Sequence, residues 1–285
     1  MSFRKKGFLS RTIRTQRRKL RQAHADWLKL AEKLNRIGQE VVLTERALDS
    51  EHGYSDYRVV ALLYFTRALS ALQAAILLAE RGMVVEANTI TREMIETTTM
   101  LAGLHRKKQD FVKELASADY AERSAAGNWY LQTPSVTEHV TEENKEKLQK
   151  FLDDLENAEF PIRKLFIANV SQKTGLSELY AIYRHLSHHY GHASMTAVSK
   201  FAVTEPATGN RAIFWSPEYG RNFVGESLGF LCSTFFGALL AVDEIWPLPG
   251  VRERISEAFD IYRRLADKSN PVHEPTDLTP LRPNK

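Results

Sequence analysis

Two long apolar runs constrain the fold of this chain more than any other feature of its sequence. They cover residues 59–79 and 227–242. The first run contains Arg67 and Gln73, and the second is short and is bounded by Glu226 and Asp243. A membrane-spanning helix needs about 20 consecutive apolar residues. We therefore predict two central helices of a water-soluble core and no transmembrane segment.

Near the N-terminus, apolar residues recur at intervals of three and four positions, which is the spacing of one face of a helix. This spacing predicts one long helix over residues 10–41, whose seam is Leu20, Ala23, Trp27, Leu30, Leu34, Ile37 and Val41. Such a seam packs either within the chain or against a second copy as a coiled coil, so a homodimer stays open. Because an alternating strand pattern is almost absent, the sequence predicts an all-α bundle of seven to eight helices with a long N-terminal basic helix.

The other predicted helices follow the same periodicity. They begin near residue 56 and then cover about residues 84–105, 109–126, 141–158, 177–202, 223–246 and 251–268. Gly82 and Gly127 are expected to end the helices before them. Residues 204–221, with two prolines and two glycines, are expected to form a lid with a short strand or loop at 211–215. We predict three parts: a basic N-terminal helix or arm (1–45), a helical bundle domain (46–268) and a flexible tail (269–285).

Positive charge is concentrated at the N-terminus. The chain carries a net charge of +4, and residues 1–25 contain nine Lys or Arg and no acid. Taking these nine from the total of 39 leaves 30 basic residues against 35 acidic ones. The arm is either a solvated helix start or a site for RNA, DNA or an anionic membrane surface. The predicted nucleic-acid-binding residues are Arg11, Arg14, Arg17, Arg18, Lys19 and Arg21.

The single cysteine and the N-terminal sequence indicate in which cellular compartment the protein is expected. Cys232 lies in an apolar run and has no second cysteine to pair with, which fits a reducing environment. No apolar segment follows the N-terminal charges as it would in a secretory signal. We therefore predict a cytoplasmic protein.

The segment YRHLSHHYGHAS, residues 183–194, holds four of the nine histidines within eight positions. On a helix these four fall within an arc of about 100°, beside an apolar face, and Ser187 points nearer that face. Three interpretations stay open. The stripe is an ordinary polar helix surface, a metal site, or a site for metal-free RNA cleavage.

The metal interpretation depends on pairs of histidines four residues apart. His185 with His189, and His188 with His192, have the spacing by which two imidazoles on one helix reach one ion, and Glu96 is the candidate third ligand. The H-E-x-x-H motif is missing. We predict no cofactor and no metal, and keep a metal-dependent hydrolase as an alternative.

The RNA-cleavage interpretation depends on Arg184 and His189. Their R-x-x-x-x-H spacing resembles the motif of the HEPN superfamily of helical ribonucleases and toxins. The resemblance implies a metal-independent ribonuclease acting as a toxin or defence effector. In that chemistry a histidine moves a proton and an arginine stabilises the charge on the transition state. On an ideal helix the two residues diverge by about 140°, so a kink at Gly191 or a dimer cleft is needed to bring them together.

A second resemblance covers two helices. The stretch RALSALQAAILLAERGMVVEANTITREMIE, followed by YRHLSHHYGHAS, resembles a bacterial helical family known only as domain of unknown function 5677, over about residues 55–245. The family pattern is R-x-x-x-E on one helix, and a tyrosine, a Leu-Ser pair and a histidine on another. It implies Arg92 and Glu96 on the first helix, and Tyr183, Ser187 and His192 on the second.

These alternatives lead to different predictions. The family resemblance selects His192, whereas the HEPN-like resemblance selects His189. A plain salt bridge on a helix surface is the other interpretation of Arg92 and Glu96. We predict a ribonuclease with Arg92, Glu96, Arg184, Ser187, His189 and His192 as its candidate catalytic residues, and a non-enzymatic helical interaction module as the alternative.

Overall fold

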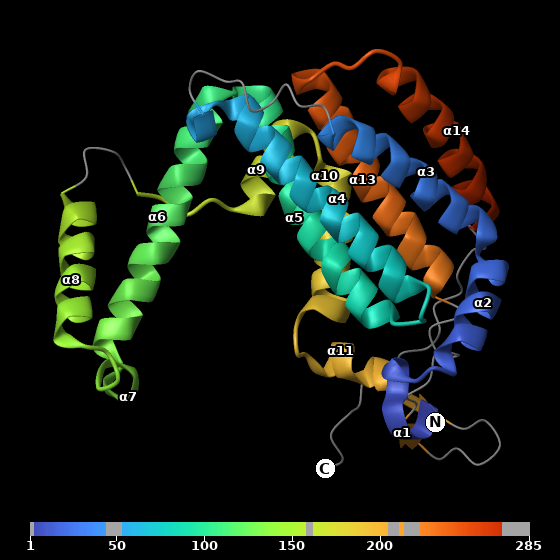
Figure 1. Ribbon diagram of the computed structural model, residues 1–285, viewed down its shortest axis with the longest axis horizontal. Coiled ribbons are helices and arrows are strands. Elements are labelled where there is room, and N and C mark those ends of the chain that lie inside the picture. The colour runs from blue at the N-terminus through green and yellow to red at the C-terminus, as the bar shows by residue number, and fades with distance from the viewer. Residues whose placement is uncertain (1–2, 44–52, 158–161, 205–210, 214–222, 270–285) are drawn as a thin grey trace, which may run out of the picture.

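The computed structural model describes residues 3–43, 53–157, 162–204, 211–213 and 223–269 (Figure 1). Within these ranges the regular structure is helical apart from one pair of three-residue strands, so the predicted all-α class is confirmed. The described part contains more helical segments than the predicted seven to eight, because several short segments connect the long helices.

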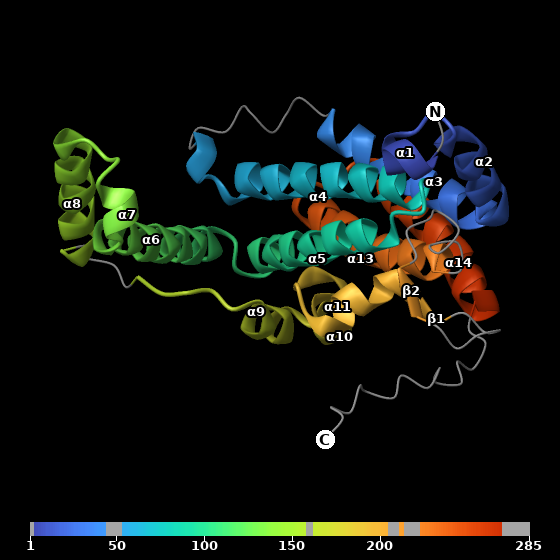
Figure 2. The ribbon, with the colours of Figure 1, turned by 90° about the horizontal axis from the view of Figure 1, so that it is seen from below.

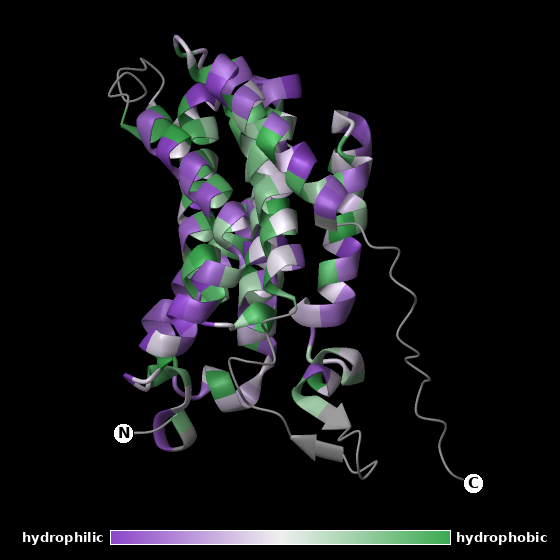
Figure 3. Ribbon diagram, turned by 90° about the vertical axis from the view of Figure 1, so that its right-hand side faces the viewer, coloured by the Kyte–Doolittle hydropathy of each residue, from purple (hydrophilic) through white to green (hydrophobic). Residues whose placement is uncertain are grey.

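Three helices form the centre of the bundle. They are α4 (Tyr57–Ala79), α5 (Val84–Lys107) and α13 (Val224–Ile245), which pack side by side (Figures 1 and 2). Asp56 caps the start of α4 by accepting a hydrogen bond from the backbone N–H of Arg58. Gly82, at a φ of 78°, reverses the chain into α5 as predicted. Hydrophobic residues gather on the helices of this centre (Figure 3).

The two apolar runs lie in this centre. α4 and α13 are long and apolar enough to cross a membrane by length and composition, and 44% and 61% of their most apolar windows are buried inside the protein. Phe65 of α4 and Phe235 of α13 are fully buried, with ring centroids 5.7 Å apart. Both helices therefore form the core that the other helices cover.

The N-terminal region differs from the single helix predicted over residues 10–41. It consists of α1 (Phe3–Lys6), a 3-10 turn η1 (Gly7–Leu9), α2 (Ile13–Ala23) and α3 (Ala25–Val42). The helix breaks at His24, whose φ of −119° and ψ of 32° are not helical. Six of the seven predicted seam residues are buried, Ala23 being the exception. α3 packs on α4, α13 and α14 (Val251–Ser269), so this seam serves the core of its own chain.

A hairpin projects from one end of the bundle. It contains α6 (Gln109–Gln132), α7 (Pro134–Thr137) and α8 (Glu142–Glu156), as Figure 1 shows on the left. The prediction that Gly127 ends the fourth helix is wrong. Gly127 lies inside α6, where a Cβ atom would meet Leu148 at 3.1 Å and Leu152 at 3.2 Å. The glycine therefore lets α8 approach α6 closely.

The remaining elements are one short turn before α4 and the segments that lead from the hairpin back to the bundle. They are η3 (Gly53–Ser55) before α4, and then α9 (Ile167–Thr174), α10 (Ser177–Leu186), the π-helical turn η4 (Ser187–Gly191), α11 (Met195–Val198), η5 (Ser199–Phe201) and the antiparallel strands β1 (Ala202–Thr204) and β2 (Arg211–Ile213). The predicted helix over residues 177–202 thus breaks near Gly191, as the glycine suggested. Most of the predicted lid and the predicted tail beyond residue 269 lie outside the described residues.

Candidate functional site

A small hydrophobic cluster joins α10 to the middle of α5. Ile95, Leu179 and Leu186 are its buried residues, and Tyr183, Tyr190 and Phe230 of α13 pack against it. The apolar face predicted for the histidine helix is therefore the face that packs on the bundle. The polar residues of α10 and η4 lie on either side of this contact.

Arg92 of α5 holds the two helices together. Its Nε donates a hydrogen bond to Ser187 Oγ at 3.1 Å, and its Nη2 lies 3.0 Å from Glu96 Oε1. The guanidinium carbon lies 5.4 Å from the centroid of the Tyr183 ring, in a cation–π contact. Arg92 is 18% exposed and Ser187 is 8% exposed. The Arg92–Glu96 pair is therefore part of a partly buried inter-helix cluster rather than a plain surface salt bridge.

Gly191 lies directly against this cluster. A Cβ atom at Gly191 would lie 2.7 Å from Arg92 Cδ, which is closer than real Cβ contacts come. Thr89 of α5 donates a hydrogen bond to the Tyr190 carbonyl at 3.2 Å and fixes the same turn. We refer to Arg92, Glu96, Tyr183, Ser187 and Gly191 as the Arg92 cluster.

The π-helical turn changes the geometry of the histidine stripe. A π-helical turn takes in more residues than an α-helical turn, and such turns occur frequently at functional sites. The helix then ends, because His192 is extended with a φ of −112° and a ψ of 149°. His192 therefore leaves the stripe that four histidines were predicted to share, and its exposed side chain has no contact with the Arg92 cluster among the interactions of the described residues.

The other three histidines of the segment crowd together. The ring centroids of His185 and His189 lie 4.5 Å apart, and those of His188 and His189 lie 4.9 Å apart. The His185 ring also lies 5.8 Å from the Phe230 ring of α13. His185 and His188 are exposed and His189 is half-buried. We refer to His185, His188 and His189 as the histidine cluster.

His189 is the histidine most affected by its surroundings. The pKa of His189 is lowered from 6.5 to about 4, mainly by burial and also by the nearby charges of His185, Lys200 and His188. Its Nδ1 is buried and has no hydrogen-bond partner among the described residues. The pKa of His185 is also lowered by burial, against the opposing effect of Glu226. His189 is therefore neutral at neutral pH, and its ring takes up a proton less readily than an ordinary imidazole.

Arg184 shows no interaction with His189 among the contacts of the described residues. Its side chain is exposed and forms no ion pair with a described acidic residue. Of the six predicted catalytic residues, the structure thus brings Arg92, Glu96 and Ser187 together and places His189 two residues along the same turn. It leaves Arg184 and His192 at the surface.

Metal ligands are not assembled in the part of the chain that the structure describes. It contains no group of three or more His, Cys, Asp or Glu side chains arranged to hold an ion. Glu96, the predicted third ligand, is paired with Arg92 instead. The described residues therefore do not support the metal interpretation of this site.

Two of the six predicted nucleic-acid-binding residues have structural partners. Arg17 and Arg21 both pair with Glu80, which is only 2% exposed at the end of α4, and Arg21 also lies 2.7 Å from Glu32. These pairs tie α2 to the bundle. The other four predicted residues are exposed, with no acidic partner among the described residues, and they are Arg11, Arg14, Arg18 and Lys19.

Sequence reasoning missed several features of this region. Gly191 was predicted only as a helix break, although it lies in contact with Arg92. Lys200, whose ammonium lies 5.5 Å from the Tyr190 ring, was not predicted at all. The basic cavity at the other end of α5, described below, was also missed, because its residues come from three separate stretches of the sequence.

Comparison with known proteins gives one match. A family model described as a family of unknown function, DUF5677, matches residues 58–210, which is more than half of the chain. The match is shorter than the resemblance predicted over residues 55–245, but it includes the Arg92 cluster and the histidine cluster. Neither the curated proteins nor the solved structures contain a match.

Proposed function

The chain belongs to the DUF5677 family, and we propose that it is a metal-independent ribonuclease of HEPN-like type, whose site is the exposed edge of the histidine cluster. The observation that carries the proposal is the buried, unpartnered Nδ1 of His189 in a ring that stays neutral at neutral pH. A buried polar atom without a partner costs free energy, and such costs are typical of functional sites.

The chemistry follows from the neutral ring. Because Nδ1 is buried, it is the Nε2 atom of His189 that accepts the proton of an RNA 2′-hydroxyl while the 2′-oxygen attacks the neighbouring phosphorus. The bond from phosphorus to the 5′-oxygen then breaks, and that oxygen takes a proton on the solvent side, where His188 is exposed. The products are a cyclic phosphate and a free 5′-hydroxyl, so no metal and no water enter the first step.

The Arg92 cluster has a positioning role in this proposal. Arg92 and Glu96 act as the orienting pair, because Arg92 holds Ser187 at the start of the π-helical turn that carries His188 and His189. Arg92 is already engaged by three partners, so it is not free to bind phosphate. That role falls to Arg184, whose guanidinium is exposed.

A homodimer is part of the proposal, because no interaction joins Arg184 to His189 within the described residues of one chain. In a dimer, Arg184 of one copy would stabilise the phosphate charge beside His189 of the other. This arrangement can be tested by mixing two inactive variants, Arg184→Ala and His189→Leu. Restored cleavage is expected in the mixture, where one of the two composite sites of a mixed dimer is intact. A mixture as inactive as its components contradicts the shared site.

RNA binding by the arm uses the four exposed cations of α2 and the residues before it. Deleting residues 1–22 would also remove the buried Leu20 and the partners of Glu80, so charge reversal is the cleaner test. Arg14→Glu with Arg18→Glu is expected to weaken RNA binding and to flatten its dependence on salt concentration. Unchanged affinity and slope would contradict a role for the arm.

The direct test of the function is cleavage of a labelled single-stranded RNA in EDTA. We expect cleavage by the wild-type chain, and a loss of about 100-fold or more in His189→Ala. His139→Ala, on the projecting hairpin, is the matched control and should retain full activity. A 2′-deoxy analogue of the RNA should not be cut. Cleavage that requires added metal, or that survives in His189→Ala, contradicts the proposal.

His192 provides a further control in the same assay. The structure leaves His192 outside the histidine cluster, so His192→Ala should cleave at nearly the wild-type rate. Loss of activity in this variant with full activity in His189→Ala would favour the family pattern over the HEPN-like pattern. RNA that binds but is never cut would favour the interaction module. A cytoplasmic toxin or defence role forms part of the proposal, and growth arrest on expression that disappears with His189→Ala would support it.

A further inference from the structure

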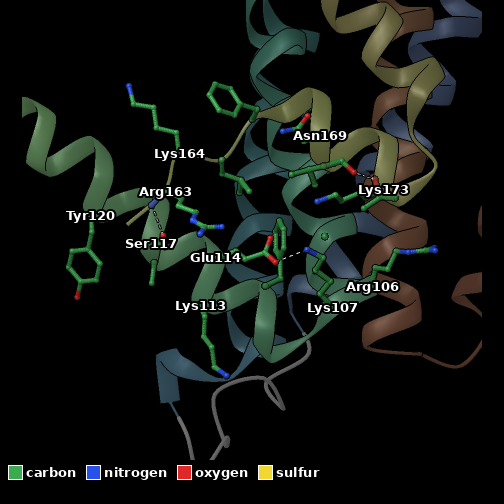
Figure 4. A pocket seen from close by; sticks show the side chains of 17 residues that line it. Arg106, Lys107, Lys113, Glu114, Ser117, Tyr120, Arg163, Lys164, Asn169 and Lys173 are labelled. Atoms are coloured by element: carbon green, nitrogen blue, oxygen red, sulfur yellow. Dashed lines mark hydrogen bonds and ion pairs between the residues drawn. The ribbon is translucent and has the colours of Figure 1, made fainter. Parts of the chain in front are cut away.

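A large cavity lies where the projecting hairpin leaves the bundle, at the opposite end of α5 from Arg92. Its volume is about 910 Å³, and its walls are the last turn of α5, the first half of α6 and the segment that leads through residues 162–166 into α9 (Figure 4). Gly103 is eleven residues from Arg92 along α5, about 16 Å at 1.5 Å per residue. The cavity is therefore separate from Arg92, and no residue of the histidine cluster lines it.

The walls of the cavity are held in place by contacts within the chain. Gly103 permits the Phe111 ring to lie against α5, because a Cβ atom there would come within 2.3 Å of that ring. Phe111 is 1% exposed and forms an apolar floor. The extended segment is anchored by the backbone N–H of Arg163, which donates to Ser117 Oγ at 2.9 Å. Contacts within the chain therefore fix the shape of the cavity.

The charges that line the cavity are almost all positive. Six cationic residues line it against one acidic residue, Glu114, and the cations are Arg106, Lys107, Lys113, Arg163, Lys164 and Lys173. Glu114 is neutralised by Lys107, whose Nζ lies 2.6 Å from its Oε1. Arg163 and Lys173 have no acidic partner within the described residues. A concave wall with unpaired charge of one sign attracts ligands of the opposite sign.

The directions of the side chains divide the cavity into an inside and a rim. Figure 4 shows Lys107, Arg163 and Lys173 turned toward the interior, whereas Lys113, Lys164 and Tyr120 point away from it. The interior therefore carries a net charge of about two positive units once Glu114 is counted. Charge of this size suits the phosphate oxygens of one small ligand, since Lys and Arg bind phosphate through charge-assisted hydrogen bonds.

Apolar surface beside these cations indicates a ligand with an aromatic part. Phe166 is 59% exposed at the edge of the cavity, although a large apolar side chain is usually buried. Asn169 lies nearby with an amide that both donates and accepts hydrogen bonds. A free phenyl ring can stack on a planar base, and the amide can bind the edge of that base.

We propose that this cavity binds a nucleoside polyphosphate, with its phosphates on Arg163 and Lys173 and its base on Phe166. The volume is within the range of small-molecule sites, which is about 300 to 1,000 Å³. The inference does not depend on the ribonuclease proposal, since none of these residues belongs to the histidine cluster or to the Arg92 cluster.

The test is a titration of the full chain with ATP, and separately with inorganic triphosphate, at low salt. ATP is expected to bind at least tenfold more tightly than triphosphate, because only ATP carries a base. Lys173→Glu and Arg163→Glu are each expected to weaken ATP binding by about tenfold or more. Lys29→Glu, on the exposed face of α3, is the control with the same change in net charge and should bind ATP like the wild type.

The Phe166→Ala variant distinguishes binding of the base from binding of the phosphates. It is expected to weaken ATP binding about fivefold or more while it leaves triphosphate binding unchanged. His189→Leu should not alter ATP binding, so failure of the ribonuclease proposal would leave this result intact.

Three results would overturn the inference. They are no ATP binding at millimolar concentration, equal ATP affinity in Lys173→Glu and Lys29→Glu, and triphosphate binding as tight as that of ATP. If ATP does not bind but Lys173→Glu abolishes binding of single-stranded RNA, the cavity is an RNA site and the nucleotide proposal is wrong.

Discussion

The Arg92 cluster and the histidine cluster both include residues of the π-helical turn η4, but they differ in how well their polar atoms are satisfied. Arg92 has an acidic partner in Glu96, a hydroxyl partner in Ser187 and a ring partner in Tyr183. His189 has a buried Nδ1 with no partner among the described residues and two other imidazoles against its ring. The difference indicates that the first cluster stabilises the fold, and it supports the proposal that the second cluster carries the chemistry.

The largest effect on stability is expected when the Arg92 cluster is disrupted. Arg92→Ala removes an ion pair, a hydrogen bond to the buried Ser187 and a cation–π contact, so the free energy of unfolding should fall by about 2–4 kcal/mol. Arg184→Ala, on the exposed side of α10, should change it by no more than about 0.5 kcal/mol. Urea unfolding of both variants measures the two values. Equal effects would mean that the cluster contributes no special stability.

A methyl group placed against Arg92 should have a smaller effect. Gly191→Ala introduces a Cβ atom 2.7 Å from Arg92 Cδ, so the arginine must move and stability should fall by about 1–3 kcal/mol. The same substitution in the Arg92→Ala background should cost much less, because the clash is gone. A double-mutant cycle measures this coupling. Additive losses would show that Gly191 acts through its own backbone instead.

Replacing the unsatisfied histidine should have the smallest effect on stability, and in the opposite direction. His189→Leu removes a buried polar atom without a partner and is expected to raise the free energy of unfolding by about 1 kcal/mol. His139→Leu on the exposed hairpin is the control and should change little. A loss of 2 kcal/mol or more in His189→Leu would show that the ring has a structural role.

The same variant gives a prediction for pH. The pKa of His189 is about 4 in the folded chain, below the ordinary 6.5, so the unfolded chain binds this proton more readily. Its contribution to stability is present above pH 6.5 and is lost as the pH falls toward 4. His185, His188, Lys200 and Glu226 are the charged groups that act on these rings. The stability advantage of His189→Leu should therefore grow between pH 7 and pH 5, and an advantage independent of pH would contradict the lowered pKa.

Apolar spacing and caps were enough to predict most of the fold. They located α4, α5, α8, α13 and α14 within a few residues, because each has a long periodic stripe and clear end signals. The break at His24 and the continuation of α6 through Gly127 were not predicted. Both depend on tertiary packing, since Gly127 is needed for the approach of Leu148 and Leu152 rather than for helix termination.

The candidate site was only partly predictable. Residue spacing suggested that Arg92 faces Glu96 and that Ser187 lies near the core face, and both were confirmed. The contact between Arg92 and Ser187 joins residues 95 positions apart, and only the family resemblance associated them. The π-helical turn, which removes His192 from the stripe, has no signal in the periodicity. The basic cavity combines residues from α5, α6 and α9 that no local pattern connects.

One measurement tests the central claim that stability and chemistry are divided between the two clusters. The rate of RNA cleavage in EDTA, expressed per folded molecule, should be compared in Arg92→Ala and His189→Leu below the unfolding transition of each. The account predicts that Arg92→Ala is much less stable but retains measurable cleavage, whereas His189→Leu is at least as stable as the wild type and cleaves at least about 100-fold more slowly. Full cleavage by a folded His189→Leu variant would contradict it.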